Sequence, residues 1–209
     1  LELGGKSALI VLDDANPAHI VGGAVGVCVH AGQACALTTR LVIHESLYPE
    51  ALAAITAAYL AVPVGDPALP GTFVGPVVSA AQKQRVLDAC DQARRDGAEI
   101  VVGGGSFEDL PDYLAGGHYV QPTVIIGADS QSAIAQQEIF GPVLVVLPFR
   151  DDEEAIRIAN DSVYGLAGAV LSGSIERGTA VARRIRTGSI GVNGGMFYGA
   201  DAPFGGFKS

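Results

Sequence analysis

Ala8-Leu9-Ile10-Val11-Leu12 is a continuous apolar run that ends at Asp13-Asp14. A short run of this kind, bounded by charged residues, is typical of a strand that is buried on both faces of a sheet. Asn16-Pro17 follows closely and favours the start of a helix, because asparagine caps helices and proline suits their first turn. The stretch therefore predicts a buried strand that leads directly into a helix.

The same alternation of apolar strands and amphipathic helices continues along the chain. Parallel strands need long crossover connections, which are usually helices. The pattern therefore predicts an α/β domain with a mostly parallel sheet and helices on both faces. No interdomain linker is visible, so we expect residues 1–209 to form one domain. The other predicted strands are 40–44, 98–102, 119–126, 142–149, 167–171 and 188–193, and the other predicted helices are 48–62, 79–96, 151–160 and 174–186.

The composition excludes several classes of protein. An apolar content of 49% with 17% charged residues is ordinary for a globular α/β protein and argues against disorder. The net charge of −9 opposes binding to nucleic acid and to anionic membrane surfaces. No apolar run approaches the roughly 18 to 20 residues that span a bilayer. We expect neither nucleic acid nor membrane as a partner.

The cysteines and histidines argue against disulfide and metal chemistry. Three scattered cysteines are too few for a disulfide framework, and the four histidines show no close ligand spacing. The first residues show no basic segment followed by an apolar one, which a secretory signal would require. We therefore expect a cytoplasmic protein with reduced thiols and no metal. Cys28 and Cys90 fall in helix-like runs and are predicted to lie in the core.

Gly32-Gln33-Ala34-Cys35 is a glycine-led turn between a helix-like run and the predicted strand 40–44. Connections of this kind often present catalytic groups from a rigid scaffold. A thiolate is a strong nucleophile near neutral pH once its surroundings stabilise the negative charge. Position alone leaves two interpretations open, because a free cysteine is also among the most commonly buried residues.

Four motifs resemble those of the aldehyde dehydrogenase superfamily and occur in that family's order. They are ELGGKS at 2–7, GQAC at 32–35, QEIFGPV at 137–143 and APFGGFKS at 202–209. The resemblance implies the catalytic half of such an enzyme, less than half of a full-length member, without the N-terminal cofactor-binding domain. It further implies a small-molecule aldehyde as substrate, NAD or NADP as cofactor, and a homo-oligomer as the full-length protein.

The resemblance assigns Cys35 as the nucleophile and Glu2 as the general base. A thiolate adds to the aldehyde carbonyl, and after oxidation the acyl group remains on the sulfur as a thioester that water must hydrolyse. The backbone N–H of Cys35 is a candidate donor to the oxyanion, and the resemblance places a second donor in the missing half. Glu138 and Phe140 match the residues that meet the nicotinamide ribose, which a carboxylate and an aromatic face suit chemically.

Four further positions match the region of the family's substrate tunnel. Asn193 follows a predicted strand, and Phe204 lies in the Pro203-Phe204-Gly205-Gly206 segment. Met196 and Tyr198 lie between them and are expected to vary with the substrate. For each of these positions, ordinary packing is the alternative interpretation.

Two other classes of function compete with the dehydrogenase. A non-catalytic assembly module would have no reason to keep Cys35, Glu2, Glu138 and Phe140 together. A thiol hydrolase would form acyl-enzymes on Cys35 without a cofactor, but it would need a histidine base, and no motif places one. Within the superfamily the acyl acceptor stays open between water, coenzyme A and phosphate.

Overall fold

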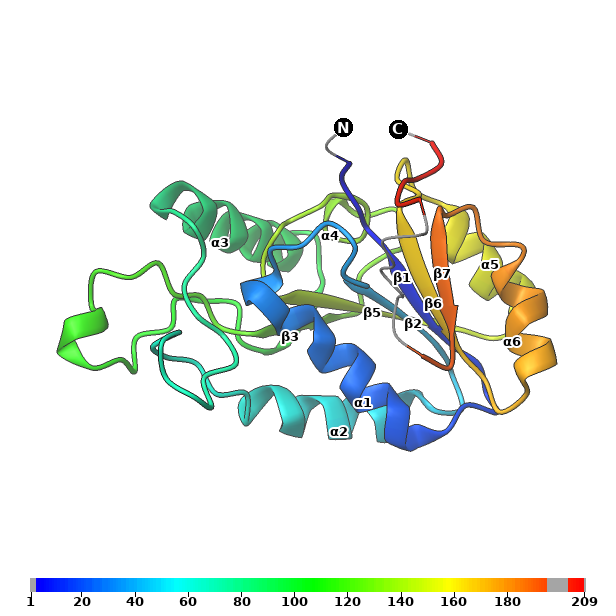
Figure 1. The fold of residues 1–209 in the computed structure, drawn as a ribbon, viewed down its shortest axis with the longest axis horizontal. Helices are drawn as coiled ribbons and strands as arrows, with labels where there is room; N and C mark the ends of the chain where they lie inside the picture. The colour runs from blue at the N-terminus through cyan, green and yellow to red at the C-terminus, as the bar shows by residue number, and fades with distance from the viewer. Residues whose placement is uncertain (1–2, 195–202, 209) are drawn as a thin grey trace.

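The computed structural model describes residues 3–194 and 203–208 (Figure 1). The strands are β1 (Ala8–Val11), β2 (Arg40–His44), β3 (Glu99–Val102), β4 (Thr123–Ile126), β5 (Val143–Phe149), β6 (Ala167–Leu171) and β7 (Ser189–Val192). The helices are α1 (Pro17–Val25), α2 (Tyr48–Leu60), α3 (Ala80–Arg95), α4 (Ala133–Gln136), α5 (Asp152–Asn160) and α6 (Ile175–Ala182), with 3₁₀ turns η1 (Gly26–Gly32) and η2 (Asp112–Leu114).

The strands form one sheet in the order β3-β4-β5-β2-β1-β6-β7. All neighbours pair in parallel except β3 and β4, which pair antiparallel. The prediction of a mostly parallel α/β sheet is therefore confirmed. Strands β2 to β5 lie on one side of β1, and the last two strands, β6 and β7, lie on its other side. The direction in which strands are added therefore reverses at β1.

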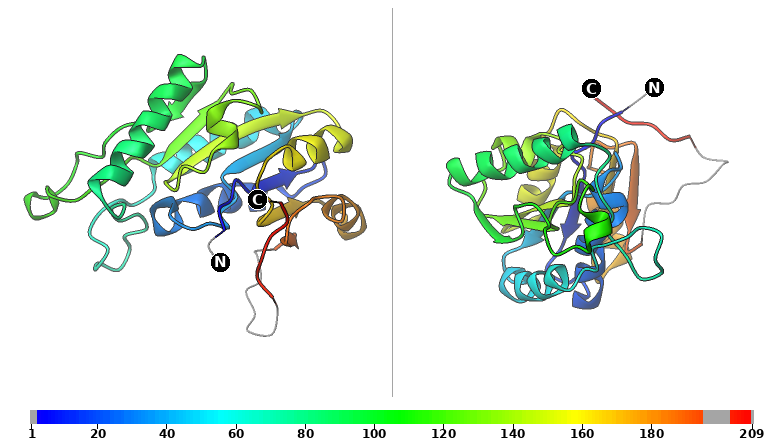
Figure 2. Two further views of the ribbon diagram at one scale, coloured as in Figure 1. Left: turned by 90° about the horizontal axis from the view of Figure 1, so that it is seen from above. Right: turned by 90° about the vertical axis from the view of Figure 1, so that its left-hand side faces the viewer.

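Helices cover both faces of the sheet (Figure 2). The crossover helices α1 and α2 pack against each other on one side of the sheet, whereas α3 lies on the side opposite α2. Helix α5 packs on β1, β2 and β5 at the centre of the sheet. None of the helices in the described part of the chain is long and apolar enough to cross a membrane.

The core is centred on β1 and its neighbours. Leu9, Ile10 and Val11 are at most 3% exposed, as expected for the middle strand of a sheet covered on both faces. Each side chain of this kind contributes about 1.5–3 kcal/mol by leaving water. The apolar run at 8–12 is thus buried because it occupies the centre of the fold.

The predicted helix starts are also confirmed. The Asn16 side chain accepts a hydrogen bond from the Ala18 N–H, and the Ser79 hydroxyl accepts one from the Gln82 N–H. These caps satisfy backbone donors that a first helical turn leaves unpaired. Cys28, which falls in a helix-like run of the sequence, lies not in α1 but in the irregular 3₁₀ turn η1 that begins at Gly26.

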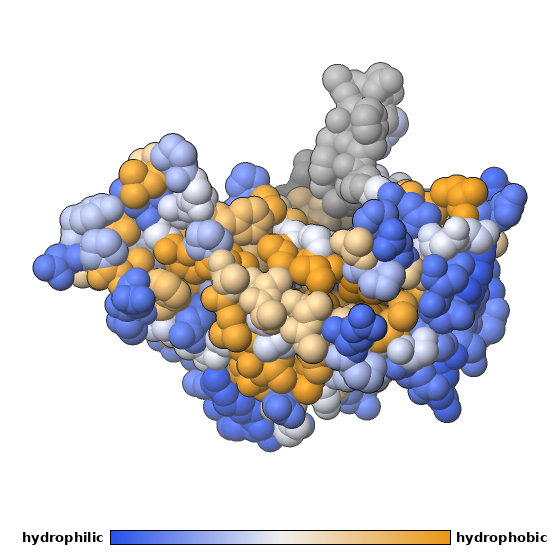
Figure 3. All heavy atoms as spheres, turned by 90° about the horizontal axis from the view of Figure 1, so that it is seen from below, coloured by the Kyte–Doolittle hydropathy of each residue, from blue (hydrophilic) through white to orange (hydrophobic). Residues whose placement is uncertain are grey.

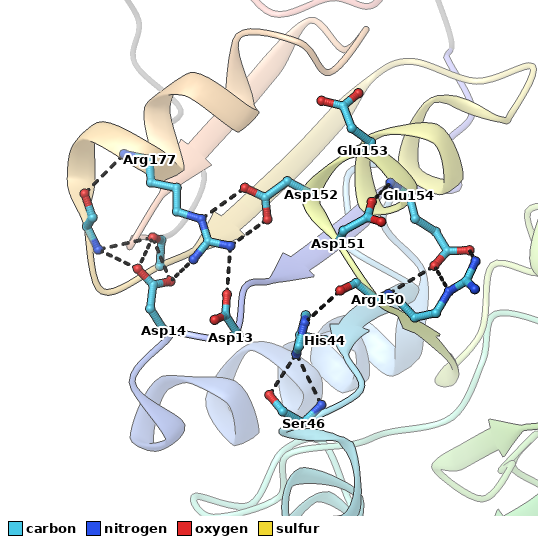
Figure 4. A network of polar contacts seen from close by, with 12 residues as sticks. Asp13, Asp14, His44, Ser46, Arg150, Asp151, Asp152, Glu153, Glu154 and Arg177 are labelled. Carbon is cyan, nitrogen blue, oxygen red and sulfur yellow. Dashed lines mark hydrogen bonds and ion pairs between the residues drawn. The ribbon is translucent and has the colours of Figure 1, made fainter.

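Charged side chains join the elements at the carboxyl-terminal edge of β1 (Figure 4). Arg177 of α6 contacts Asp152 at 2.6 Å, Asp13 at 2.7 Å and Asp14 at 3.5 Å. The arginine therefore links the end of β1 to the first residues of α5 and to α6. This network lies at the carboxyl-terminal ends of the parallel strands. The cavity described below lies at their amino-terminal ends.

An apolar groove of about 630 Å³ follows α1. It is lined by small residues of α1 (Ala18, Gly22 and Gly23), by Gly26 at the start of η1, and on the sheet by Leu9, Ala169 and Leu171. Figure 3 shows the side of the molecule that carries α1 and α2, with apolar residues gathered at its middle.

Candidate functional site

Three connections meet at the amino-terminal edge of the sheet. Residues 3–7 lead into β1, residues 33–39 into β2 and residues 137–142 into β5. These strands are neighbours and run in parallel, so the segments that precede them lie side by side. Together they border a cavity of about 650 Å³, which lies within the usual size range of ligand pockets. Its described lining is Leu3, Gly4, Gln33, Ala34, Cys35, Glu138, Phe140, Phe204, Gly205 and Gly206.

Glycines allow the three connections to touch through their backbones. A Cβ atom on Gly5 would lie 2.1 Å from the Cys35 carbonyl oxygen. A Cβ atom on Gly32 would lie 1.9 Å from the Gly141 carbonyl carbon, and Gly32 also has a φ of +75°, which favours glycine. The turn that carries Cys35 is therefore fitted between the connections that lead to β1 and β5.

Cys35 is the cysteine that lines the cavity, and its side chain is only partly buried. Cys28 and Cys90 are both 0% exposed, as predicted for core residues. Burial raises the pKa of Cys28 to about 12 and that of Cys90 to about 11, so both thiols stay protonated and unreactive at neutral pH. Among the described residues, no hydrogen bond uses the Cys35 backbone N–H, which leaves that group able to donate to a ligand.

Glu138 and Phe140 line the same cavity as Cys35. The Glu138 Oε1 atom accepts a hydrogen bond of 2.9 Å from the Gly5 N–H, so its carboxylate is held against the connection that leads to β1. A Cβ atom on Gly4 would lie 2.9 Å from Glu138 Oε2, so glycine at this position lets the carboxylate approach the backbone closely. Phe140 adopts a φ of +59°, an unfavourable conformation for a bulky side chain.

The other predicted residues fall in different places. Phe204 lines the cavity and is 47% exposed. Asn193 is instead paired with Ser172: its Oδ1 accepts from the Ser172 N–H at 2.9 Å, and its Nδ2 donates to the Ser172 carbonyl at 2.7 Å. These contacts lie beyond the carboxyl ends of β6 and β7, and Asn193 borders the α1 groove. Its role near the substrate stays a prediction.

Three of the predicted residues lie outside the described part of the chain. They are Glu2, Met196 and Tyr198. In the sequence, Glu2 directly precedes Leu3, and Leu3 lines the cavity. The assignments of Glu2 as base and of Met196 and Tyr198 as substrate contacts stay predictions.

The described lining suits a nicotinamide cofactor better than a metal. A carboxylate can accept hydrogen bonds from the two hydroxyls of a ribose, and the Phe140 ring offers an apolar face beside it. The described residues contain no group of three or more potential metal ligands, and no histidine is among those that line the cavity.

Two basic residues are buried where the connection to β1 meets the start of β2. Arg40, 2% exposed, donates to the backbone carbonyls of Lys6, Ile158 and Ala159, and so fixes the connection to β1 against the end of α5. Lys6 is 1% exposed, and its Nζ has no hydrogen-bond partner among the described residues. Burial lowers the pKa of Lys6 to about 7, and the charge of Arg40 adds to this effect.

We expect Lys6→Met to stabilise the folded chain at pH 7, by at most roughly 5 kcal/mol. In the unfolded chain the lysine keeps its proton up to its ordinary pKa of 10.5, whereas in the folded chain it loses the proton near pH 7. The wild-type chain therefore gains stability from this group as the pH rises from 7 to 10.5. The advantage of the variant should be constant below pH 7 and should shrink across that window.

Urea unfolding of both chains below pH 7, at pH 7 and near pH 10 would measure this difference. Lys83→Met, on the partly exposed surface of α3, is the control and should show no such pH-dependent gap. A stability difference between Lys6→Met and wild type that does not change between pH 7 and pH 10 would show that Lys6 is charged in the folded state.

Two side chains of α3 reach this site without having been predicted from the sequence. Gln82 and Arg85 donate hydrogen bonds to the backbone of residues 138–140. They lie more than 50 residues before their partners, and both have the polar character of ordinary solvent-facing helix residues. No local pattern in the sequence distinguishes them.

Comparison with known proteins gives one consistent result. A sequence model described as "Aldehyde dehydrogenase family" matches residues 1–209. The chain is 41% identical over 209 residues to a 3-succinoylsemialdehyde-pyridine dehydrogenase of Pseudomonas sp. It is 40% identical over 210 residues to a betaine aldehyde dehydrogenase of Rhizobium etli. Both alignments cover 100% of this chain but only 43% and 42% of the relatives. The chain thus spans about two fifths of their length.

Solved structures agree with the sequence relatives. A crystal structure of betaine aldehyde dehydrogenase from Staphylococcus aureus in complex with NAD⁺ superposes with a TM-score of 0.96 at 38% identity, covering 100% of this chain and 41% of that one. An aldehyde dehydrogenase from Mycobacterium tuberculosis complexed with NAD⁺ gives a TM-score of 0.90 at 44% identity, covering 100% and 42%. The fold described above therefore also occurs in a part of each of these proteins.

Proposed function

The chain belongs to the aldehyde dehydrogenase family, and we propose that it is the catalytic part of an enzyme that oxidises an aldehyde to a carboxylic acid with NAD(P). One observation carries the proposal. Cys35 lies on the connection before β2, Glu138 and Phe140 lie on the connection before β5, and all three line one cavity. That arrangement provides a nucleophile beside groups that suit a nicotinamide ribose.

Cys35 begins the reaction as the nucleophile. Its thiolate adds to the carbonyl carbon of the aldehyde, which forms a carbon–sulfur bond and places the negative charge on the former carbonyl oxygen. The backbone N–H of Cys35 is the donor in this chain that would stabilise this oxyanion. After oxidation, the acyl group remains bound to Cys35 as a thioester.

Glu138 and Phe140 would hold the cofactor. The carboxylate would accept hydrogen bonds from the ribose hydroxyls, while the phenyl ring packs beside the sugar or the nicotinamide. When bound, NAD(P) supplies the acceptor for the hydride that leaves the substrate carbon. The NAD⁺ complexes of the Staphylococcus aureus and Mycobacterium tuberculosis relatives support NAD in this role.

Glu2 would complete the cycle as the general base. It would take a proton from water, and the resulting hydroxide would attack the thioester carbon, release the acid and return the Cys35 thiolate. The adjacency of Glu2 to Leu3, which lines the cavity, supports this role. Water as the acyl acceptor is part of the proposal.

We propose that this chain acts together with a preceding segment that carries most of the cofactor-binding fold. The support is the coverage of the relatives, of which this chain matches about two fifths. The complete enzyme, meaning this chain joined to that segment, would act on a small-molecule aldehyde in the cytoplasm, where its three free cysteines stay reduced. We propose that the complete enzyme is a homo-oligomer, as the resemblance to the family implies.

The chain alone is expected to fold but not to oxidise aldehydes. Its main hydrophobic core extends across the sheet, whereas we propose that most of the surface that holds the hydride acceptor belongs to the preceding segment. The test compares the chain alone with the complete enzyme, each mixed with NAD or NADP and several aldehydes, by the absorbance of reduced cofactor. Turnover by the complete enzyme only is the expected result. Steady turnover by the chain alone would contradict the proposal that a preceding segment is needed for cofactor binding. No turnover by the complete enzyme would contradict the proposed function.

A further inference from the structure

The connection that carries Glu138 and Phe140 has an unusual backbone. It contains no helix or strand, and Phe140 has a φ of +59°. A bulky residue keeps this left-handed conformation only when its surroundings enforce it. The groups that enforce it therefore also decide where the two neighbouring side chains lie.

The enforcing contacts come from the first turns of α3. The Gln82 Nε2 group donates to the carbonyl oxygens of both Ile139 and Phe140, each at 2.8 Å. Arg85, three residues later on the same side of the helix, donates to the Glu138 carbonyl at 2.6 Å. Three successive backbone carbonyls are thus held by two side chains.

The start of α3 is also tied to the turn that carries Cys35. The Val78 N–H donates to Gln33 Oε1 at 2.9 Å, and Ser79 caps the helix through the Gln82 N–H. Gln33 belongs to the lining of the cavity. The beginning of α3 therefore bridges the turn before β2 and the connection before β5.

We propose that Gln82 is a positioning residue that holds the 138–140 backbone and thereby places Glu138 and Phe140 in the Cys35 cavity. A primary amide has two N–H groups, so one nitrogen can serve both carbonyls. The importance of Gln82 for cofactor binding rests on the proposed function, whereas its hydrogen bonds to the 139 and 140 carbonyls do not. The amide nitrogen is the essential feature, because a carboxylate of the same shape would set two acceptors against two carbonyls.

Hydrogen exchange on this chain alone tests the structural half of the proposal. We expect Gln82→Glu to speed amide exchange across residues 138–141 by about tenfold or more, and Gln82→Met to speed it less, because methionine removes the donors without adding repulsion. Gln84→Met is the matched control. Gln84 is exposed on the same helix, donates only within it to Asp88, and should leave exchange at 138–141 unchanged.

Which of the two Gln82 variants exchanges faster at residues 138–141 distinguishes a positioning role of Gln82 from a packing role. If Gln82 only filled space, the isosteric glutamate would be tolerated better than methionine. Unchanged exchange at 138–141 in both folded variants, or faster exchange in the methionine variant than in the glutamate variant, would overturn the proposal. Circular dichroism of each variant confirms folding, and the methionine variant serves if the glutamate variant does not fold.

Kinetics of the complete enzyme test the functional half. We expect Gln82→Met to raise the KM for the cofactor by about tenfold with a smaller change in kcat, because displaced ribose contacts weaken binding before they affect bond breaking. The rate of Cys35 alkylation should stay unchanged. An unchanged cofactor KM together with faster exchange at 138–141 would show that the backbone is held by Gln82 but does not position the cofactor. Absence of turnover in the wild-type enzyme would instead refute the proposed function and leave the exchange result intact.

Discussion

Replacing Cys35 by alanine in the complete enzyme should reduce aldehyde oxidation by at least roughly 10⁴-fold, because no other group can form the covalent adduct. The side chain is small and only partly buried, so its loss should disturb the fold little. Steady-state rates of cofactor reduction, measured beside unfolding curves for the same proteins, would check both statements.

Cys28→Ala and Cys90→Ala are the matched controls for this experiment. Both thiols are buried and held in the protonated form, so their replacement should act through packing alone and leave turnover within a few-fold of wild type. A loss of turnover in well-folded Cys28→Ala comparable to that of Cys35→Ala would overturn the assignment of the nucleophile.

Gly32→Ala should destabilise the chain by roughly 3 kcal/mol or more, because two costs add. The new Cβ would lie 1.9 Å from the Gly141 carbonyl carbon, which is backbone and cannot rotate away. The φ of +75° at this position also disfavours any side chain. In the complete enzyme, turnover should fall as well, because the turn that carries Cys35 must move away from the 138–140 connection. Urea unfolding of the chain measures the first effect directly.

Gly22→Ala provides the control for glycine replacement in the same region. A Cβ there would meet no atom within 4 Å, and the residue lies inside α1. Alanine should therefore stabilise the chain by about 0.5–1 kcal/mol through its better helix propensity. If Gly32→Ala were as stable as wild type, the close packing of the connections before β2 and β5 would be wrong.

The strands could be predicted because they are apolar and local in sequence. The run at 8–12 predicts a buried strand by itself, and β2 and β5 have a similar apolar signal. The sheet order could not be predicted, because it depends on contacts between residues far apart in the chain, such as the pairing of β2 with β5. Helix α4 was missed, since its four residues, Ala133–Gln136, are too short to show a helical period.

In the site, too, the contacts between residues far apart in the sequence could not be predicted. The resemblance of motifs identified Cys35, Glu138 and Phe140, and the fold brings these three residues to one cavity. It did not reveal Gln82, whose role depends on a contact across 57 and 58 residues of sequence. It also did not reveal that the Asn193 amide is paired with the Ser172 backbone. A motif can identify a candidate residue, but the hydrogen bonds that hold this residue in place are known only from the folded structure.

The central claim is that the acyl group of the substrate passes through a thioester on Cys35. Glu2→Gln in the complete enzyme should slow hydrolysis and let this thioester accumulate, while a first turnover of reduced cofactor still appears. The reaction would be quenched with acid after that burst, digested and examined by mass spectrometry. The account predicts the acyl mass on the peptide that contains Cys35. An acyl mass on another residue, or aldehyde oxidation by this variant with no covalent adduct at any time, would contradict it.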